Sequence, residues 1–294
     1  MKVAAVSYLN TAPLIEGLDA WDGIEMVRSV PAGIGEMVAR GEADFGLASI
    51  VDFAKFNDCE GGGLVMIPAG MIGCEGPTLT VRLFSSVPIE EITSVHADTD
   101  SHTSVILCNL VLKSMGVNAA FVDFDVRERV ASGDGSEHTE NPIDPNADGW
   151  PEAVLMIGDK VVTGSPAAVR YPHQVDLGQA WHEMTGLPFV YAVWMCRADR
   201  VEDEDIRSGA LVLERTMLRN RMRIDWIVMN HAKRLGWPTD LAQRYIGELL
   251  RFKVDDRAQR AVEVFLSNAA DAGLVDHVDP KWMELGITQE GTSV

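Results

Sequence analysis

Basic residues are scarce in this chain, which has 294 residues with 25 Lys and Arg against 44 Asp and Glu, a formal net charge of −19. The resulting negative potential repels phosphate backbones and anionic lipid surfaces. The charge therefore argues against nucleic acid and membranes as partners, and it leaves the oligomeric state open. An anionic small-molecule substrate would need a local source of positive potential to overcome this field.

Long hydrophobic runs and paired cysteines are also missing. No stretch approaches the roughly 18 apolar residues of a membrane-spanning helix, and the apolar run after Lys2 is shorter than the about 7–15 residues of a secretory signal. The four cysteines, Cys59, Cys74, Cys108 and Cys196, contain no CxxC pair, which favours reduced thiols in the core over a zinc site. These absences predict a cytoplasmic protein.

The common catalytic signatures are absent as well. The sequence has no GxxxxGKS or GxxxxGKT loop for phosphate, no HExxH metal motif and no GxSxG nucleophile elbow. Gly33 and Gly35 lack the third glycine of a dinucleotide-binding loop, and the seven histidines show no ligand spacing. The sequence therefore predicts neither a metal nor a cofactor.

What is present is an alternation of strands and helices. This alternation predicts an α/β fold with a largely parallel sheet. Thr11 is expected to cap the first helix, and Ser49 and Asp52 have the spacing of a capping box. Strands are expected at residues 2–7, 24–30, 44–48, 78–85, 95–98, 121–124 and 154–157, with helices at 13–18, 35–40 and 105–113.

The second half of the chain becomes helical. An aromatic strand at 187–194 precedes predicted helices at 206–226, 227–235, 240–250 and 255–272. At about 150 residues per domain, the length suggests two domains. We predict one lobe from residues 1–85 and 191–294 and another from 86–190, with the strands Thr78–Ser85 and Phe189–Trp194 crossing between them. This layout places a ligand cleft between the lobes.

One segment departs from this pattern. Residues Ser132–Glu152 contain six acids, three glycines and three prolines, but no Lys or Arg. This composition is typical of a mobile surface loop. The segment also carries a fair share of the excess negative charge.

Polar side chains cluster where predicted strands end and helices begin. The clusters are Ser7–Thr11, Ser49, Ser101–Ser104 and Ile157–Asp159. Carboxyl ends of strands and amino ends of helices border the ligand crevice of an open α/β sheet, and helix amino ends carry partial positive charge. Helix capping explains each cluster taken alone, but their recurrence favours a shared site for a small anion.

Five motifs in order carry a resemblance to a known family. They are VSYLNTAPL at Val6–Leu14, GEADFGLAS at Gly41–Ser49, SHTS at Ser101–Ser104, LMIGD at Leu155–Asp159, and the segment Asp176–Trp194 with DLGQAW and TGLPFVYAVW. Together they resemble the MqnA family, the chorismate dehydratases of the futalosine route to menaquinone. Two positions differ. Thr80 stands where the family usually has serine, and the titratable His102 stands where it tends to have a permanently charged arginine.

The resemblance implies a periplasmic-binding-protein type II fold, with two α/β lobes around a cleft and a helical C-terminal region. It implies a lyase that removes water from chorismate, a small dianion, to give 3-(1-carboxyvinyloxy)benzoate without a cofactor. Two alternatives stay open. One is a solute-binding module for a small carboxylate that performs no chemistry, and the other is the related 1,4-dihydroxy-6-naphthoate synthase.

On this resemblance we assign residues to the site. Asn10 and Thr80 are expected to hydrogen-bond the ring substituents and to orient or polarise the C4 hydroxyl, while Asp159 or the substrate's own enolpyruvyl carboxylate accepts the C3 proton. The aromatic residues Phe189, Tyr191 and Trp194 are expected to pack the core and hinge. Substrate-binding positions are expected at Tyr8, Thr11, Ser49, Arg82, Ser101, His102, Thr103, Ser104 and Gly158, with the helix N–H groups at 101–104 helping to hold a carboxylate.

Overall fold

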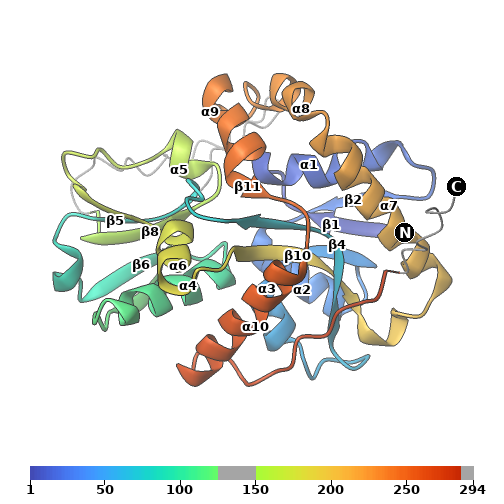
Figure 1. Cartoon of the computed structure of the whole chain (residues 1–294), viewed down its shortest axis with the longest axis horizontal. Coiled ribbons are helices and arrows are strands. Elements are labelled where there is room, and N and C mark those ends of the chain that lie inside the picture. Colours follow the sequence, from blue (N-terminus) through green and yellow to red (C-terminus); the bar gives the residue numbers. More distant parts are fainter. Residues whose placement is uncertain (125–149, 286–294) are drawn as a thin grey trace, which may run out of the picture.

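The computed structural model describes residues 1–124 and 150–285, and its strands form two separate sheets (Figure 1). The expected alternation of strands and helices is present in the first half of the chain. The acidic segment Ser132–Glu152 lies outside the described residues except for its last three. The chain therefore divides its strands between two α/β units.

The first sheet has the strand order β11-β4-β10-β3-β1-β2. β1 is parallel to β2 and β3, whereas β10 is antiparallel to β3 and β4, and β11 is antiparallel to β4. The inner strands β1, β3 and β10 are almost continuously buried, as expected for strands covered on both faces. The six strands are β1 (Lys2–Ala5), β2 (Glu25–Arg28), β3 (Phe45–Ser49), β4 (Leu64–Cys74), β10 (Phe189–Arg197) and β11 (Leu250–Arg251).

The second sheet has the order β7-β6-β8-β5-β9. β6 is parallel to β7 and β8, whereas β5 is antiparallel to β8 and β9. The prediction of a largely parallel sheet is therefore wrong, because β5 and β10 enter their sheets against the direction of their neighbours. The five strands are β5 (Val81–Ser85), β6 (Ser94–Asp98), β7 (Ala120–Phe124), β8 (Ala153–Ile157) and β9 (His173–Asp176).

The chain passes between the sheets twice. It runs from β4 to β5 through residues 75–80, and it returns from β9 to β10 through α6 (Leu177–Thr185) and residues 186–188. The strand predicted at 78–85 begins only at Val81, because the backbone N–H groups of Thr78 and Leu79 bind the Asp176 carboxylate. The lobe boundaries at residues 85 and 190 stay a prediction.

Strand β4 was not predicted, although it is the longest strand of the first sheet. Its pairing with β10 jumps in register, so that Val193 faces Met71 and the next residue, Trp194, faces Ile67. The three intervening residues of β4 are Pro-Ala-Gly. Proline and glycine are tolerated within a strand at such an irregularity, and they hide the strand from a search for apolar alternation.

Helices α2, α7 and α10 pack on the first sheet, and α4, α5 and α6 pack on the second. The predicted helical C-terminal region is present, but the helix expected at 240–250 ends at Arg244 and continues as the π-helical turn η5 (Tyr245–Leu249). No helix within residues 1–124 and 150–285 is long and apolar enough to span a membrane. The helices are η1 (Leu9–Thr11), α1 (Ala12–Ile15), η2 (Leu18–Ala20), α2 (Pro31–Ala39), α3 (Ile50–Lys55), η3 (Ile89–Glu91), α4 (His102–Ser114), α5 (Lys160–Thr163), α6, η4 (Ala198–Arg200), α7 (Glu204–Arg221), α8 (Ile224–His231), α9 (Thr239–Arg244), η5 and α10 (Asp256–Asp271).

An aromatic cluster joins the two units at the second crossing. The Trp181 ring of α6 lies edge-on to Phe189 of β10 and Phe265 of α10, with ring centroids 5.3 and 5.9 Å apart. Trp181 Nε1 also donates to the carbonyl oxygen of Pro188 at 2.9 Å. Phe189 and Trp194 are almost fully buried, so these two aromatics pack in the core.

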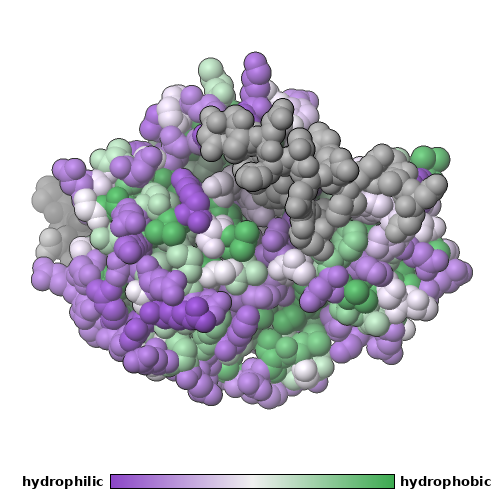
Figure 2. All heavy atoms as spheres, turned by 180° about the vertical axis from the view of Figure 1, so that it is seen from behind, coloured by the Kyte–Doolittle hydropathy of each residue, from purple (hydrophilic) through white to green (hydrophobic). Residues whose placement is uncertain are grey.

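The surface and the thiols follow the composition. Figure 2 shows hydrophilic side chains over most of one face, with hydrophobic ones in smaller groups between them. The four cysteines form no disulfide, and Cys74, Cys108 and Cys196 are buried. Burial raises the pKa of the Cys74 and Cys196 thiols to about 12. These thiols are therefore neutral core side chains.

Candidate active site

A cavity of about 70 Å³ lies between the two sheets, where β1, β3 and β8 end and β5 begins. The polar residues that line it and were not predicted are Thr78, Tyr191 and Tyr245. Among the lining residues that the structure describes, none is a Lys, Arg or His. The predicted site residues that line it are Tyr8, Asn10, Ser49, Thr80, Ser101, Ser104 and Gly158.

Asn10 lies on the short helix η1 that follows β1. The neighbouring Thr11 hydroxyl donates to Asn10 Oδ1 at 3.1 Å, and it makes no capping bond to α1. The prediction that Thr11 caps this helix is therefore wrong, because its hydroxyl is used to orient the Asn10 amide. Thr11 is fully buried behind Asn10 and does not line the cavity.

Tyr245 brings the C-terminal helices into the site. Its hydroxyl lies 2.5 Å from Thr80 Oγ1, and it also hydrogen-bonds Asn10. Burial holds the pKa of Tyr245 well above its usual range, so the phenol stays neutral. Its ring stacks on Trp237 with centroids 4.9 Å apart. The two predicted catalytic residues Asn10 and Thr80 therefore share one hydroxyl partner from a distant part of the chain.

The amino ends of α3 and α4 meet across the cleft and exchange their caps. The Ser49 hydroxyl, at the end of β3, accepts the backbone N–H of Thr103 at 3.1 Å. The Thr103 hydroxyl accepts the backbone N–H of Val51 at 3.3 Å, and the two hydroxyls also hydrogen-bond each other. The expected capping box at Ser49 and Asp52 is wrong, because Ser49 makes no cap bond to its own helix α3.

Ser101 caps its own helix, α4, which is the capping role that explains this cluster when it is taken alone. Its hydroxyl accepts the backbone N–H of Ser104 at 3.2 Å and donates to the Ser104 hydroxyl at 2.9 Å. The N–H groups of Thr103 and Ser104 are therefore already engaged within the protein. The hydroxyls of Ser101 and Ser104 line the cavity together with the positive end of α4.

His102 lies outside the cavity and contacts the other lobe. Its Nδ1 lies 2.8 Å from Oδ1 of Asp52, whose side chain is fully buried in α3. Burial raises the pKa of Asp52, and the hydrogen bond to His102 opposes that rise. His102, one of the two residues that differ from the family pattern, thus forms a second bridge across the cleft, beside the exchanged caps.

Gly158 lines the cavity, and Asp159, the next residue, bonds the segment that follows β1. Gly158 has φ +71°, and a Cβ atom there would lie 3.1 Å from the ring of Tyr8. Only glycine therefore fits this approach between the lobes without strain. The Asp159 carboxylate accepts the backbone N–H of Leu9 at 3.2 and 3.4 Å, and it does not line the cavity.

Arg82 is a further predicted residue that lies outside the lining of the cavity, as Thr11, His102, Thr103 and Asp159 do. It lies on β5, where its guanidinium donates to Gln174 at 3.1 Å and to Asp176 at 3.4 Å. It is not among the residues that line the cavity. Within the two described ranges, no group of three His, Cys, Asp or Glu residues is arranged to hold a metal ion.

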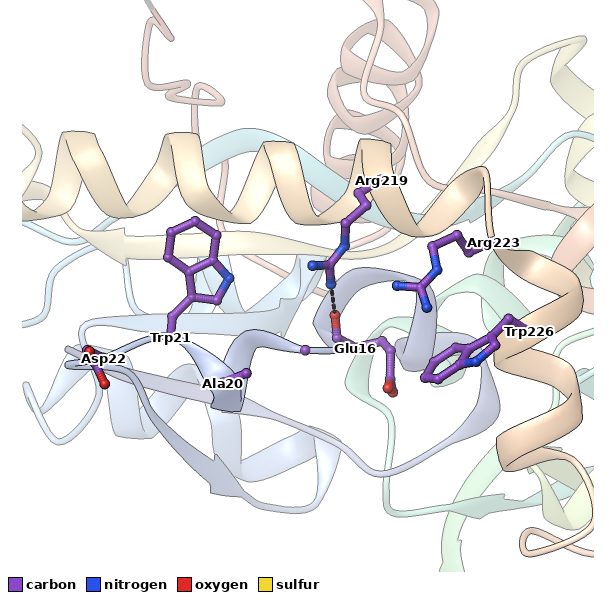
Figure 3. A pocket seen from close by; sticks show the side chains of 8 residues that line it. Glu16, Ala20, Trp21, Asp22, Arg219, Arg223 and Trp226 are labelled. Carbon is purple, nitrogen blue, oxygen red and sulfur yellow. Dashed lines mark hydrogen bonds between the residues drawn. The ribbon is translucent and has the colours of Figure 1, made fainter.

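A larger and more open hollow of about 560 Å³ lies outside the cleft, between η2 and the helices α7 and α8 (Figure 3). Arg219 there donates to the Glu16 carbonyl oxygen at 2.7 Å, and the Arg223 guanidinium lies 4.4 Å from the Trp226 ring centroid. None of the predicted site residues lines this hollow. The cleft, where the polar junctions converge, is therefore the candidate active site.

Comparison with solved structures identifies the fold. A protein from Archaeoglobus fulgidus superposes with a TM-score of 0.64 at 15% identity, covering 93% of this chain and 98% of that chain. The periplasmic aliphatic sulphonate binding protein SsuA from Escherichia coli superposes with a TM-score of 0.58 at 13% identity, covering 100% of this chain and 97% of that chain. The predicted periplasmic-binding-protein-like α/β fold is confirmed.

Comparison of sequences identifies the family. A chorismate dehydratase from Thermus thermophilus is 26% identical over 272 residues, which cover 88% of this chain and 91% of the relative. A chorismate dehydratase from Campylobacter jejuni is 27% identical over 146 residues, which cover 47% of this chain and 62% of the relative. Residues 1–271 match the family described as menaquinone biosynthesis. The chain therefore belongs to the menaquinone biosynthesis family, as its five motifs predicted.

Proposed function

We propose that this chain dehydrates chorismate to 3-(1-carboxyvinyloxy)benzoate, a step of menaquinone biosynthesis, in the cytoplasm. The observation that carries the proposal is the convergence of Asn10, Thr80 and Tyr245 in the cleft. The two relatives described above bear the name of this activity. The convergence supplies the neutral hydrogen-bonding groups that this reaction needs.

The reaction breaks the C4–O and C3–H bonds of chorismate and releases water. The ring becomes aromatic, so the main tasks of the protein are to position the substrate and to help the hydroxyl leave. In our proposal the Asn10 amide and the Thr80 hydroxyl bind the C4 hydroxyl. Tyr245 stays neutral and holds the Thr80 hydroxyl in one orientation, so that both groups meet the developing charge without rearrangement.

The C3 proton needs an acceptor near the substituted carbon. The Asp159 carboxylate accepts the Leu9 N–H and lies outside the lining of the cavity. We therefore assign the proton to the substrate's own enolpyruvyl carboxylate, whose ether oxygen is bonded to C3. This carboxyl group then passes the proton to the departing hydroxyl, so that water is released. Asp159 then serves as a bridge between the lobes, because it belongs to the β8–α5 turn whereas Leu9 follows β1.

The carboxylates of the substrate require a local positive potential. In our proposal the Ser101 and Ser104 hydroxyls hold one carboxylate at the amino end of α4, where the aligned peptide dipoles give about half a positive charge. Tyr8 and Ser49 complete the wall on the side of the first sheet. Thr11 hydrogen-bonds Asn10, and Thr103 hydrogen-bonds Ser49. The lack of a side chain at Gly158 lets the ring of Tyr8 approach it.

Substrate entry requires the lobes to separate. A cavity of about 70 Å³ has room for about two water molecules at ~30 Å³ each, and ligand pockets hold roughly 300–1,000 Å³. We propose that the lobes open about the crossings at 75–80 and 186–188, as hinge proteins do. The bridges between Asp52 and His102 and between Leu9 and Asp159 then break and form again around the bound substrate.

The test is an assay of the purified chain with chorismate. We expect the diene absorbance to fall and mass spectrometry to detect the benzoate product. The Asn10→Ala variant should lower kcat by at least about tenfold, since donors to a developing charge contribute at this scale or above. The control is Asn230→Ala. Asn230 is exposed on α8, where its side-chain amide donates to the Trp226 carbonyl oxygen of the same helix, and we expect this variant to keep the wild-type kcat.

The same assay separates the alternatives. Binding of chorismate in calorimetry without product would identify a solute-binding module and would refute the lyase. Turnover of the cyclic futalosine derivative in place of chorismate would identify a naphthoate synthase. A wild-type rate in Asn10→Ala would remove Asn10 from the reacting centre.

A further inference from the structure

The backbone immediately before Thr80 adopts a strained turn. The N–H of Thr80 donates to the carbonyl oxygen of Thr78 at 2.9 Å, and the intervening Leu79 has φ +69°. An i to i+2 bond with positive φ at the central residue defines the rare, strained form of γ-turn. Among the described residues, Leu79 is the only one other than glycine with positive φ. Strain of this kind persists only where the surroundings hold it.

The side chain that holds this turn is Asp176. Its Oδ1 accepts the N–H of Thr78 at 2.9 Å, and its Oδ2 accepts the N–H of Leu79 at 2.8 Å. Asp176 lies at the end of β9, and Oδ1 also caps α6 through the N–H groups of Gly178 and Gln179 at 3.1 and 3.2 Å. One carboxylate therefore fixes the first crossing to the start of the helix that leads into the second crossing.

The turn determines where the Thr80 side chain lies. Directly after it, the Thr80 carbonyl oxygen accepts the N–H of Gly158 at 2.9 Å, and Thr80 Oγ1 lies 2.5 Å from the Tyr245 hydroxyl. A change in the direction of the backbone at Leu79 would move Oγ1 away from the cavity. Thr80 is almost fully buried, so it has no nearby solvent to replace these partners.

We propose that Asp176 is a positioning residue, whose carboxylate holds the strained turn at Leu79 and thereby directs the Thr80 hydroxyl into the cleft. The proposal rests on the proposed function, in which that hydroxyl binds the departing group. Asp176 does not line the cavity, so it acts through the backbone segment that it holds in front of Thr80. Its predicted effect is therefore on kcat rather than on substrate affinity.

The simpler explanation is that Asp176 is only the N-cap of α6. The chain offers a matched case in Asp255, which caps α10 by accepting the N–H of Ala258 at 2.9 Å. Asn and Asp are about equally good N-caps. A residue that only caps a helix should therefore tolerate the change to Asn, and Asp255→Asn should keep both the wild-type melting temperature and the wild-type kcat.

Asp176→Asn should behave differently, although the side chain keeps its size. The amide has one oxygen and one NH₂ group, so it cannot accept at both of the positions that Oδ1 and Oδ2 occupy in the wild-type chain. If the oxygen keeps the cap of α6, the NH₂ group faces the N–H of Leu79. We expect kcat to fall about 10- to 100-fold, the effect of misplacing a reacting group by around 1 Å, with KM changed much less. Wild-type kcat in Asp176→Asn would overturn the proposal.

A second comparison measures the strain without any substrate. Leu79→Gly and Leu79→Ala both remove the side chain, but only glycine adopts φ +69° freely. We expect the glycine variant to melt about 2–4 °C above the alanine variant. The difference should shrink in the Asp176→Asn background, because the released turn lets alanine relax to a negative φ, and the glycine should recover part of the lost kcat there. A more stable alanine variant in both backgrounds would show that no strain is held there.

The two arms separate the failure of this proposal from failure of the proposed function. If the wild-type chain does not convert chorismate, the lyase is refuted, and the melting temperatures of the four Leu79 variants still decide whether Asp176 holds the turn. If the wild-type chain converts chorismate and Asp176→Asn does so equally well, the positioning role is refuted and the lyase stands.

Discussion

Removing the hydroxyl of Tyr245 tests the centre of the proposed site. The Tyr245→Phe variant keeps the ring that stacks on Trp237, and it deletes the oxygen that lies 2.5 Å from Thr80 Oγ1 and also hydrogen-bonds Asn10. Both Thr80 and Tyr245 are almost fully buried. The Thr80 hydroxyl and the Asn10 amide then each lose one partner and gain freedom to rotate.

The expected magnitude has a stability part and a rate part. A net hydrogen bond contributes about 1 kcal/mol to the free energy of unfolding, which corresponds to a fall in Tm of about 2 °C in a chain of this size. Groups that bind a developing charge directly contribute about 100-fold or more to kcat. Since Tyr245 acts through Thr80 and Asn10, we expect kcat of Tyr245→Phe to fall by about tenfold.

The assay compares Tyr245→Phe with a tyrosine that makes an equivalent bond elsewhere. Tyr171 is also buried, and its hydroxyl donates to the Pro151 carbonyl oxygen at 2.7 Å, away from the cavity. Tyr171→Phe should lower Tm to a similar extent and leave kcat unchanged. Because burial keeps Tyr245 neutral, its removal should not shift the pH–rate profile. Equal kcat in the two variants would refute the role of Tyr245.

Two further predictions concern stability. Gly158→Ala and Gly186→Ala both place a side chain at positive φ, but only the side chain at position 158 also meets the ring of Tyr8. We therefore expect each variant to lose about 1–2 kcal/mol of unfolding free energy, and only Gly158→Ala to lose more and to show a raised KM. Equal losses of unfolding free energy in urea titrations would contradict this. Burial raises the pKa of Asp98 to about 6 despite its ion pair with Lys160. Because the native state then holds this proton to a higher pH than the unfolded state does, the unfolding free energy should fall by roughly 3 kcal/mol as pH rises from about 4 to 6. Asp98→Asn should remove this fall from the pH dependence of the unfolding free energy, and an unchanged slope would contradict the shift.

Much of the site could be predicted because it lies where strands end. Asn10 and Gly158 follow β1 and β8, Ser49 ends β3, and the polar segment at Ser101 follows β6. Carboxyl ends of neighbouring strands meet at one edge of a sheet, so polar residues at those positions converge whatever the details of packing. The alternation of strands and helices predicted the two α/β units for a similar reason.

Other parts depend on long-range packing that no local pattern records. Tyr245 reaches the cleft only because the helix after Thr239 ends in a π-helical turn, and its sequence indicates an uninterrupted helix. The caps at Ser49 and Thr103 are exchanged between lobes, whereas the sequence pattern of a capping residue is the same for a local and a distant partner. Asp176 likewise carries the pattern of an ordinary cap.

The net charge of −19 can now be related to the proposed substrate. Cations near the second sheet are engaged by carboxylates, since Arg82 contacts Asp176, and Lys160 is held by Asp98 at 2.6 Å and Asp100 at 2.7 Å. Surface charges more than about 8 Å away are largely screened at physiological ionic strength. The amino end of α4 and the hydroxyls that line the cavity act at contact distance instead. A dianion in the proposed closed cleft would therefore experience these groups, and not the acidity of the surface.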